Sequence, residues 1–212
     1  MLKINEIFFS IQGESSLAGY PTVFVRTSGC HLRCTYCDTT YAYYEGKKLA
    51  LDEIIVEVQK HPARHVCLTG GEPLLQPDCL DLMKKLCDLG YVVSLETSGD
   101  LSCEGIDPRV LKIIDVKTPD SGAADRFSTK NLDLSDTNSE FKFVICSEND
   151  FYWSEKFVNE NKLTDKYMVY YSPSHGKIET RWLAEKILSE KSKARLQLQL
   201  HKYIWSADTR GV

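Results

Sequence analysis

Apolar positions along this chain follow two alternating spacings, one typical of strands and one of helices. Short runs rich in valine, isoleucine and aromatic residues predict six successive strands, each followed by polar or glycine residues. These runs span residues 20–27, 66–69, 91–95, 111–116, 140–145 and 167–171. Further strands are expected at residues 6–11 and at about 195–205, where Leu196, Leu198 and Leu200 alternate with polar residues.

Three stretches between the predicted strands have the period of an amphipathic helix. In the first of them, Leu51, Ile54, Ile55 and Val58 recur at the spacing that places side chains on one helical face. The helices are expected over residues 51–60, 75–89 and 178–191. Residues 91–115 leave little room for a full helix between two strands, so we expect fewer helices than strands.

The order of these elements predicts an α/β fold in which helices cover a parallel sheet. Because helices are fewer than strands, we expect an incomplete, abbreviated (β/α)6 partial barrel that forms a single domain over residues 1–212. Polar and glycine residues gather after the strands, at the rim where barrel-type folds bind their ligands. The polar segment 120–138 has no period, and we expect a surface loop there.

Composition narrows the classes of protein to consider. Of the 212 residues, 42% are hydrophobic and 26% are charged, which is typical of a soluble globular protein. The net charge of −4 argues against general nucleic-acid binding, and no apolar run approaches the roughly 20 residues of a membrane span. Residues 1–6 lack the apolar block of a signal peptide. We therefore expect a cytoplasmic protein, whose eight cysteines indicate metal binding or catalysis.

Three of these cysteines, Cys30, Cys34 and Cys37, lie within eight residues at the spacing Cys-x3-Cys-x2-Cys. A closed zinc site takes four ligands, and a cubane used only for electron transfer takes four cysteines. Three thiolates would instead hold three irons of a [4Fe–4S] cluster and leave the fourth iron free to bind a ligand. A zinc knuckle completed by His31 or by a distant cysteine is the alternative. Either metal group would sit in a loop at about residues 28–47.

The cysteine spacing resembles the signature of the radical S-adenosylmethionine (SAM) superfamily, and a second segment strengthens the resemblance. Gly70-Gly71-Glu72-Pro73 directly follows a predicted strand, and this superfamily uses such a segment to bind the amino group of SAM. The resemblance implies that the three cysteines hold a [4Fe–4S] cluster and that SAM binds its open iron. It also implies that one electron cleaves SAM to a 5′-deoxyadenosyl radical, chemistry that a protein leaves to its cofactor.

Four more segments narrow the resemblance to the 7-carboxy-7-deazaguanine synthase family. They are Ile-Gln-Gly-Glu at residues 11–14, Arg26, Cys37-Asp38-Thr39, and Gln-Leu-His-Lys at residues 199–202. This family converts 6-carboxy-5,6,7,8-tetrahydropterin to 7-carboxy-7-deazaguanine and ammonia, a radical ring contraction on the pathway to queuosine and other 7-deazapurines. The resemblance therefore implies a lyase with a [4Fe–4S] cluster, SAM and Mg²⁺ as cofactors.

The same resemblance implies roles for individual residues. The residues implied to contact the pterin substrate are Ile11, Gln12, Gly13, Glu14, Arg26, Thr69 and His201. Those implied to contact SAM are Gly71, Glu72, Glu96, Ser98, Ser147 and Asn149. Thr39 is the implied protein ligand of Mg²⁺, and Arg26 is suited to bidentate pairing with the substrate carboxylate.

Plainer interpretations of some of these residues stay open. Arg26 also reads as a solvated charge on a strand, and His201 as a packed histidine at a strand end. Glu96 and Lys117 are equally well placed for an ion pair with each other. Ser15 stands where many relatives have glycine, which leaves the conformation of its loop open.

The implied partners are the pterin and an electron donor such as flavodoxin or ferredoxin. An incomplete barrel also favours a homodimer, because a second copy would cover exposed surface. Two rival hypotheses stay in view. A glycyl-radical-enzyme activating enzyme shares the cysteine spacing but acts on a protein, so a tight pterin complex would argue against it. A zinc-bound interaction module predicts stoichiometric zinc and leaves the segment at residues 70–73 unexplained.

Overall fold

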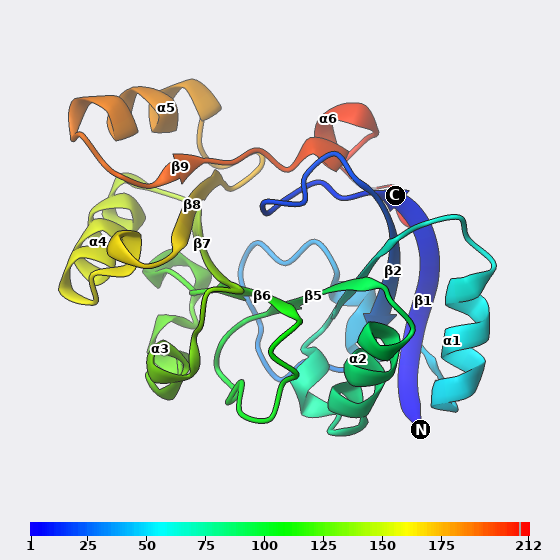
Figure 1. The fold of residues 1–212 in the computed structure, drawn as a ribbon. Helices are drawn as coiled ribbons and strands as arrows, with labels where there is room; N and C mark the ends of the chain where they lie inside the picture. The colour runs from blue at the N-terminus through cyan, green and yellow to red at the C-terminus, as the bar shows by residue number, and fades with distance from the viewer. Residues whose placement is uncertain (208) are drawn as a thin grey trace.

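A nine-stranded sheet forms the centre of the computed structural model, which describes residues 1–207 and 209–212 (Figure 1). The strands are β1 (Leu2–Ile11), β2 (Pro21–Thr27), β3 (Lys47–Leu49), β4 (His65–Gly70), β5 (Val92–Thr97), β6 (Leu111–Asp115), β7 (Ser139–Ile145), β8 (Met168–Pro173) and β9 (Arg195–Leu196). Their order across the sheet is β3-β1-β2-β4-β5-β6-β7-β8-β9. All neighbours from β2 to β9 pair in parallel, whereas β1 pairs antiparallel with both β2 and β3.

The strands β2 and β4 to β8 are the six that the sequence predicts. Their apolar runs are buried on both faces, as the adjacent residues Phe24 and Val25 in β2 and Phe143 and Val144 in β7 illustrate. Parallel strands read as nearly continuous hydrophobic runs because neither face of the sheet meets water. Since these strands run in one direction, their carboxyl ends share one edge of the sheet.

Helices pack around the outside of the curved sheet, and the cysteine loop after β2 lies inside its curve (Figure 1). These outer helices are α1 (Leu51–Gln59), α2 (Asp78–Asp88), α3 (Lys130–Leu134), α4 (Glu148–Glu160) and α5 (Thr180–Ser189), whereas α6 (Leu200–Ile204) lies over the end of the sheet. One core cluster joins α1 and α2 to strands β1 to β5, and a second joins α4 and α5 to strands β6 to β8. Residues 98–110 are all described and contain no helix, so the expected shortage of helices is confirmed. No helix in the described residues combines the length and apolar character needed to cross a membrane.

The segment 120–138 is more ordered than its sequence indicates. It contains short 3-10 turns at Pro119–Ser121 and Ala124–Arg126 and the helix α3. Asn131 in α3 is fully buried, and its side-chain amide bonds to three backbone groups of residues 99–103. This part of the chain is therefore ordered by hydrogen bonds to another segment. Such bonds produce no hydrophobic period in the sequence, so the sequence gives no sign of them.

The strand expected at about 195–205 is wrong, because only β9 joins the sheet and α6 follows it. The leucines alternate as in a strand, but the backbone groups bond elsewhere. The Gln197 N–H still donates to the Tyr171 carbonyl of β8, but the Leu200 N–H donates to the Gly13 carbonyl, on the loop after β1, at 3.1 Å. The chain therefore leaves the sheet edge after Gln197 and crosses the end of the sheet, where α6 begins (Figure 1).

Candidate active site

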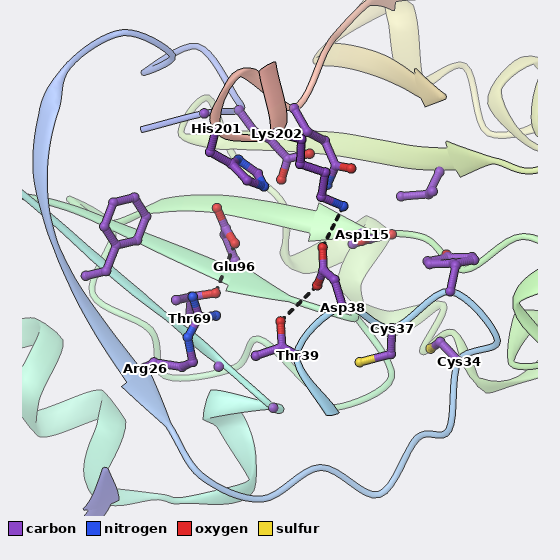
Figure 2. Close-up of a pocket in the computed structure, with 18 of the residues that line it drawn as sticks. Arg26, Cys34, Cys37, Asp38, Thr39, Thr69, Glu96, Asp115, His201 and Lys202 are labelled. Atoms are coloured by element: carbon purple, nitrogen blue, oxygen red, sulfur yellow. Dashed lines mark hydrogen bonds and ion pairs between the residues drawn. The ribbon is translucent and has the colours of Figure 1, made fainter. Parts of the chain in front are cut away.

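A cavity of about 530 Å³ lies at the carboxyl edge of the parallel strands (Figure 2). This volume is in the range of pockets that hold small molecules. Most of the residues that the sequence singles out line it: Ile11, Gln12, Gly13, Glu14, Arg26, Cys30, Cys34, Cys37, Thr39, Thr69, Gly71, Glu96, Ser98 and His201. The fold thus brings the loop after β1, the cysteine loop, the strand ends and α6 to one place.

Glu72 does not line the cavity. Its side chain is fully buried and accepts hydrogen bonds from the Ser98 backbone N–H at 2.8 Å, the Ser98 hydroxyl at 2.6 Å and the Thr97 hydroxyl at 2.9 Å. Burial raises the pKa of Glu72, and these hydrogen bonds oppose that rise. The residue expected to contact SAM therefore holds the end of β5 in place, and Ser98, which it anchors, is the one that reaches the cavity.

Ser147 and Asn149 also lie outside the set of residues that line the cavity. The Ser147 hydroxyl accepts a hydrogen bond from the Asp150 N–H and so caps α4. Asn149 is exposed in the first turn of that helix. A serine that follows a strand and precedes polar residues is typical both of a helix start and of a ligand-binding loop. Here the segment forms the start of helix α4.

The three cysteines of the motif all line the cavity and are all free thiols. Figure 2 shows Cys34 and Cys37 on the same loop, directed toward the inside of the curve. Burial raises the pKa of Cys30 and of Cys34, and the neighbouring thiols raise both pKa values further. Iron binds thiolates, so cluster assembly here has to release protons. Cys67 and Cys79, in contrast, are fully buried in the core and belong to its packing.

Gly71 lies against the cysteine loop so closely that no side chain fits. A Cβ atom built on it would be 2.0 Å from the Gly29 carbonyl oxygen and 2.9 Å from the Cβ of Cys30. The Glu72 N–H donates to the same Gly29 carbonyl at 2.9 Å. The backbone after β4 is therefore held directly beside the first cysteine and exposed to the cavity, as binding of a ligand by backbone groups requires.

Two buried polar atoms on the loop after β1 have no hydrogen-bond partner among the described residues. One is the amide Nε2 of Gln12, a donor, and the other is Oε1 of Glu14, an acceptor. Gln12 is 2% exposed and Glu14 is 6% exposed, and both line the cavity. The Gln12 Oε1 atom accepts from the Glu14 N–H at 3.3 Å, which turns the amide nitrogen the other way. Buried polar atoms are normally paired, so this donor and acceptor are suited to a ligand.

A charged group that the sequence analysis did not single out forms one wall of the cavity. Lys142 of β7 lies 3.0 Å from Glu14 Oε2 and 3.6 Å from Asp115 Oδ2. Lys117 lies 3.0 Å from the same Asp115 oxygen, which corrects the expected pair between Lys117 and Glu96. Burial raises the pKa of Asp115, but the two lysines outweigh it and hold that pKa below its usual value. The signal in the sequence is a lysine between two phenylalanines, inside the run Phe141–Ile145 that is otherwise apolar.

Arg26 and Thr69 lie on neighbouring strands, and each has one polar partner in the wall. Arg26 donates through Nε to Glu6 at 2.8 Å, and its guanidinium lies 5.4 Å from the centre of the Phe8 ring. Thr69 donates its hydroxyl to Glu96 at 3.0 Å (Figure 2). Burial raises the pKa of Glu96. The expected solvated charge at Arg26 is thus wrong, because the side chain is packed and directed by an acid.

Thr39 belongs to a chain of hydrogen bonds that closes one side of the cavity. Its hydroxyl donates to Asp38 Oδ1 at 2.9 Å, and Asp38 Oδ2 lies 2.7 Å from Lys202 Nζ on α6 (Figure 2). Burial would raise the pKa of Asp38, but Lys202 and Thr39 lower it to about 2. Asp38 is therefore a carboxylate that fixes the Thr39 hydroxyl and ties α6 to the cysteine loop.

His201 lies on the same helix and points into the cavity (Figure 2). Burial lowers its pKa, which favours the neutral ring. A Cβ atom on Gly13 would come 2.3 Å from His201 Nδ1, so the ring lies directly against the backbone of the loop after β1. Because α6 spans Leu200–Ile204, His201 lies in the first turn of a helix and not at a strand end.

Comparisons with known proteins assign the chain to a family. Residues 24–120 match the radical SAM superfamily. The 7-carboxy-7-deazaguanine synthase of Chlorobaculum tepidum is 46% identical, and the match covers 100% of this chain and 97% of that one. The synthase of Koribacter versatilis is 40% identical over the full length of both chains. This chain belongs to the 7-carboxy-7-deazaguanine synthase family.

A structural comparison agrees on the fold of this family. The crystal structure of QueE from Escherichia coli matches with a TM-score of 0.78 and 23% identity, covering 93% of each chain. The expected partial barrel is therefore confirmed, and the rival interpretations as an activating enzyme or a zinc module are not favoured. Membership in a radical SAM family implies a [4Fe–4S] cluster and SAM.

The residues on this cavity wall fit those groups chemically. Three free thiols in one loop supply the ligands for three irons, and the bare backbone at Gly71 lies beside Cys30 where SAM would bind. In the described part of the chain no three His, Cys, Asp or Glu side chains already converge on a single metal position. Three thiols on one loop of the cavity are the donor set that a [4Fe–4S] cluster with one open iron requires.

Proposed function

We propose that this chain converts 6-carboxy-5,6,7,8-tetrahydropterin to 7-carboxy-7-deazaguanine and ammonia, using a [4Fe–4S] cluster, SAM and Mg²⁺. The observation that carries the proposal is the free donor at Gln12 Nε2 and the free acceptor at Glu14 Oε1, both on the wall of the cavity. A pterin presents hydrogen-bond acceptors and N–H donors side by side on one edge. Such an edge would satisfy both buried atoms together.

At the cofactor end of the cavity, Cys30, Cys34 and Cys37 would hold the cluster, with Gly71 and Ser98 beside SAM. When bound and reduced, the cluster supplies the electron that cleaves SAM to the radical that starts the ring contraction. The part of this chain is to hold the pterin carbon next to that radical and to exclude water. A fixed geometry of this kind can contribute several powers of ten to a rate.

Next to the cysteines, Thr39 of the same loop and Arg26 of β2 would bind the carboxylate side of the pterin. The Thr39 hydroxyl donates its proton to Asp38, so the lone pairs of its oxygen remain for Mg²⁺, which prefers oxygen ligands. Arg26 uses Nε for Glu6, and the two terminal nitrogens of its guanidinium are suited to a bidentate carboxylate contact. His201 and Thr69 would complete the enclosure of the ring.

The proposal extends to the setting of the enzyme. We propose a cytoplasmic homodimer that receives its electron from a donor such as flavodoxin or ferredoxin. Large apolar side chains are exposed, among them Phe9 in β1 at 39%, Tyr20 at 52% and Val56 in α1 at 55%. Burial of exposed apolar surface favours association of two copies. Sedimentation of the reconstituted protein at twice the mass of one chain would support the dimer.

Anaerobic turnover tests the activity. The reconstituted protein is incubated with SAM, dithionite, Mg²⁺ and 6-carboxy-5,6,7,8-tetrahydropterin, and the products are identified by mass spectrometry. We expect 7-carboxy-7-deazaguanine, with SAM not consumed in proportion to it. SAM cleavage without this product would overturn the proposed substrate and return the activating enzyme to consideration. Stoichiometric zinc with no SAM cleavage would overturn the cluster assignment itself.

A further inference from the structure

Lys142 occupies a position where a lysine is unfavourable. Every residue of β7 is buried, and Lys142 lies between Phe141 and Phe143 with only 7% of its side chain exposed. An ammonium group in such a place is strongly destabilising unless acids and hydrogen bonds compensate for its lost water. A lysine is therefore a poor choice for packing alone, and its contacts have to account for it.

Two carboxylates contact Lys142: Glu14 on the loop after β1, and Asp115 at the end of β6. A third, Glu96 of β5, acts on Lys142 through its charge. Burial lowers the pKa of Lys142, but these acids outweigh burial and raise it above its ordinary value. The group is thus a fixed cation, and it allows three acids to share one wall of the cavity.

The two oxygens of Glu14 differ in their surroundings. Oε2 lies 3.0 Å from Lys142 Nζ, whereas Oε1 has no partner among the described residues. Glu14 is 8% exposed at its side chain, so water does not replace the missing partner freely. Oε2 is therefore held by Lys142, and Oε1 is free to accept hydrogen bonds from a ligand.

We infer that Lys142 is a positioning residue for the substrate, which acts through Glu14 by fixing Oε2 so that Oε1 accepts from the amino and ring N–H groups of the pterin. A carboxylate held in this way has lost its rotational freedom before the ligand arrives, so binding orders less of the protein. This inference rests on the proposed pterin reaction, since it assigns the partner of Glu14 to that substrate.

A purely structural role makes a different prediction. If Lys142 served only to balance buried charge, its loss would lower stability and leave the affinity of the folded protein for a pterin unchanged. Lys112 provides a matched control for that role. It is a buried lysine on the adjacent strand β6, 3% exposed and 2.9 Å from Asp136, and it does not line the cavity.

Binding of 6-carboxypterin, an unreactive and fluorescent oxidised analogue, is measured on the anaerobic holoenzyme with SAM. We expect Lys142→Met to weaken binding by about tenfold or more, the range of a hydrogen bond to a charged group. Lys142→Arg, which keeps the cation, should recover most of the affinity. Lys112→Met should bind the analogue like the unmodified protein. Equal affinity in folded Lys142→Met and unmodified protein would overturn the inference.

A double-mutant cycle separates action through Glu14 from direct contact with the ligand. On the Glu14→Gln background, adding Lys142→Met should change the dissociation constant by less than about twofold, because the group through which it acts is already gone. Additive losses would contradict the positioning role. The double variant also removes one buried charge of each sign, so it provides a folded protein if Lys142→Met alone does not fold.

The failure of this inference differs from the failure of the proposed function. Unmodified holoenzyme that neither binds the analogue nor forms 7-carboxy-7-deazaguanine would overturn the proposed function. Holoenzyme that does both, with a Lys142→Met variant that binds equally tightly, would leave the function standing and remove only the role of Lys142.

Discussion

The side-chain amide of Gln197 holds both backbone polar groups of Ser15, 182 positions earlier in the chain. Its Oε1 accepts from the Ser15 N–H at 2.9 Å, and its Nε2 donates to the Ser15 carbonyl at 3.1 Å. This pair fixes the loop that presents Gln12 and Glu14 to the cavity. The geometry of the proposed substrate contacts therefore depends on a residue that does not itself line the cavity.

Replacement of Gln197 tests this dependence. Gln197→Leu leaves the Ser15 N–H unpaired and removes one of the two hydrogen bonds to its carbonyl, which also accepts from the Ala18 N–H at 3.3 Å. The loss should cost about 1–3 kcal/mol in the free energy of unfolding. We also expect a KM for the pterin raised about tenfold, with SAM cleavage in the absence of pterin unchanged. Steady-state kinetics and denaturant unfolding measure the two effects.

Gln76 offers a matched control for that variant. Its side chain makes the same two bonds to the backbone of Lys3, at 2.7 Å and 3.0 Å, and it does not line the cavity. Gln76→Leu should lower stability by a similar amount while leaving the KM for the pterin unchanged. An equal rise in KM for both variants would show that general loosening, and not the Ser15 contact, is responsible.

Ser15 itself is predicted to be a strained residue. Its φ of 67° lies in the left-handed region that glycine adopts easily and other residues adopt at a cost of roughly 1–2 kcal/mol. The two hydrogen bonds from Gln197 to the Ser15 backbone explain how serine is tolerated in this conformation. Ser15→Gly should raise the free energy of unfolding by up to about 1 kcal/mol, with the loss of the Ser15 hydroxyl contact to Leu17 reducing the gain. Thermal unfolding measures whether the variant is more or less stable than the unmodified protein. A less stable Ser15→Gly variant would contradict the conclusion that Ser15 is strained.

Loss of one motif cysteine should abolish the cluster. Cys34→Ala removes one of the three proposed ligands, so reconstituted protein should hold less than four irons and lose both SAM cleavage and turnover. Cys146→Ala is the control, because Cys146 is a partly buried free thiol outside the motif. Iron and sulfide analysis with absorption spectra measures the outcome. A full cluster in Cys34→Ala would exclude Cys34 as a ligand.

Removal of the Thr39 hydroxyl should change the dependence of turnover on the Mg²⁺ concentration and leave the cluster unchanged. Thr39→Ala is expected to keep the cluster and basal SAM cleavage but to need a much higher Mg²⁺ concentration for turnover, since one oxygen ligand is missing. Thr39→Ser keeps an oxygen in place and should restore the response. Turnover is measured against Mg²⁺ concentration, and an unchanged response in Thr39→Ala would exclude this residue as the ligand.

The pH dependence of stability should contain a contribution from His201. Burial, Lys202 and Lys142 lower its pKa, while Glu14 and Asp38 oppose them. Below the ordinary pKa of about 6.5, the unfolded state therefore binds more protons than the folded state, and stability falls as pH falls. His201→Gln should remove this contribution and flatten the curve between about pH 5 and 7. The lowered pKa of His65 has the same sign and remains in both proteins, so the difference between the curves reports His201.

The elements that the sequence predicts well are those whose own residues determine them. The apolar runs of β2 and β7 and the one-sided period of α1 are local patterns, and the cysteine spacing is local too. The predictions fail where contacts with distant parts of the chain determine the secondary structure. Asn131 orders α3 through bonds to residues 99–103, and the leucines after Arg195 alternate as in a strand while Gln197 and Leu200 bond to other parts of the chain.

The candidate site follows the same division. Residues adjacent to a motif, such as Thr39 and Gly71, were predicted and line the cavity. Glu72 belongs to the predicted SAM segment but does not line the cavity, because sequence adjacency does not determine which way a side chain turns after a strand. Lys142 was missed because its importance comes from Glu14, which lies 128 positions away and meets it only in the folded sheet.

The bond between the Leu200 N–H and the Gly13 carbonyl has a consequence for biosynthesis. A ribosome releases the cysteine loop long before it makes the segment that covers the cavity. Until that segment is translated, the carboxyl edge of the sheet lacks α6, and the Asp38 carboxylate lacks its Lys202 partner. The nascent chain therefore presents its cysteine loop before α6 and the Lys202–Asp38 contact exist to close that side of the cavity.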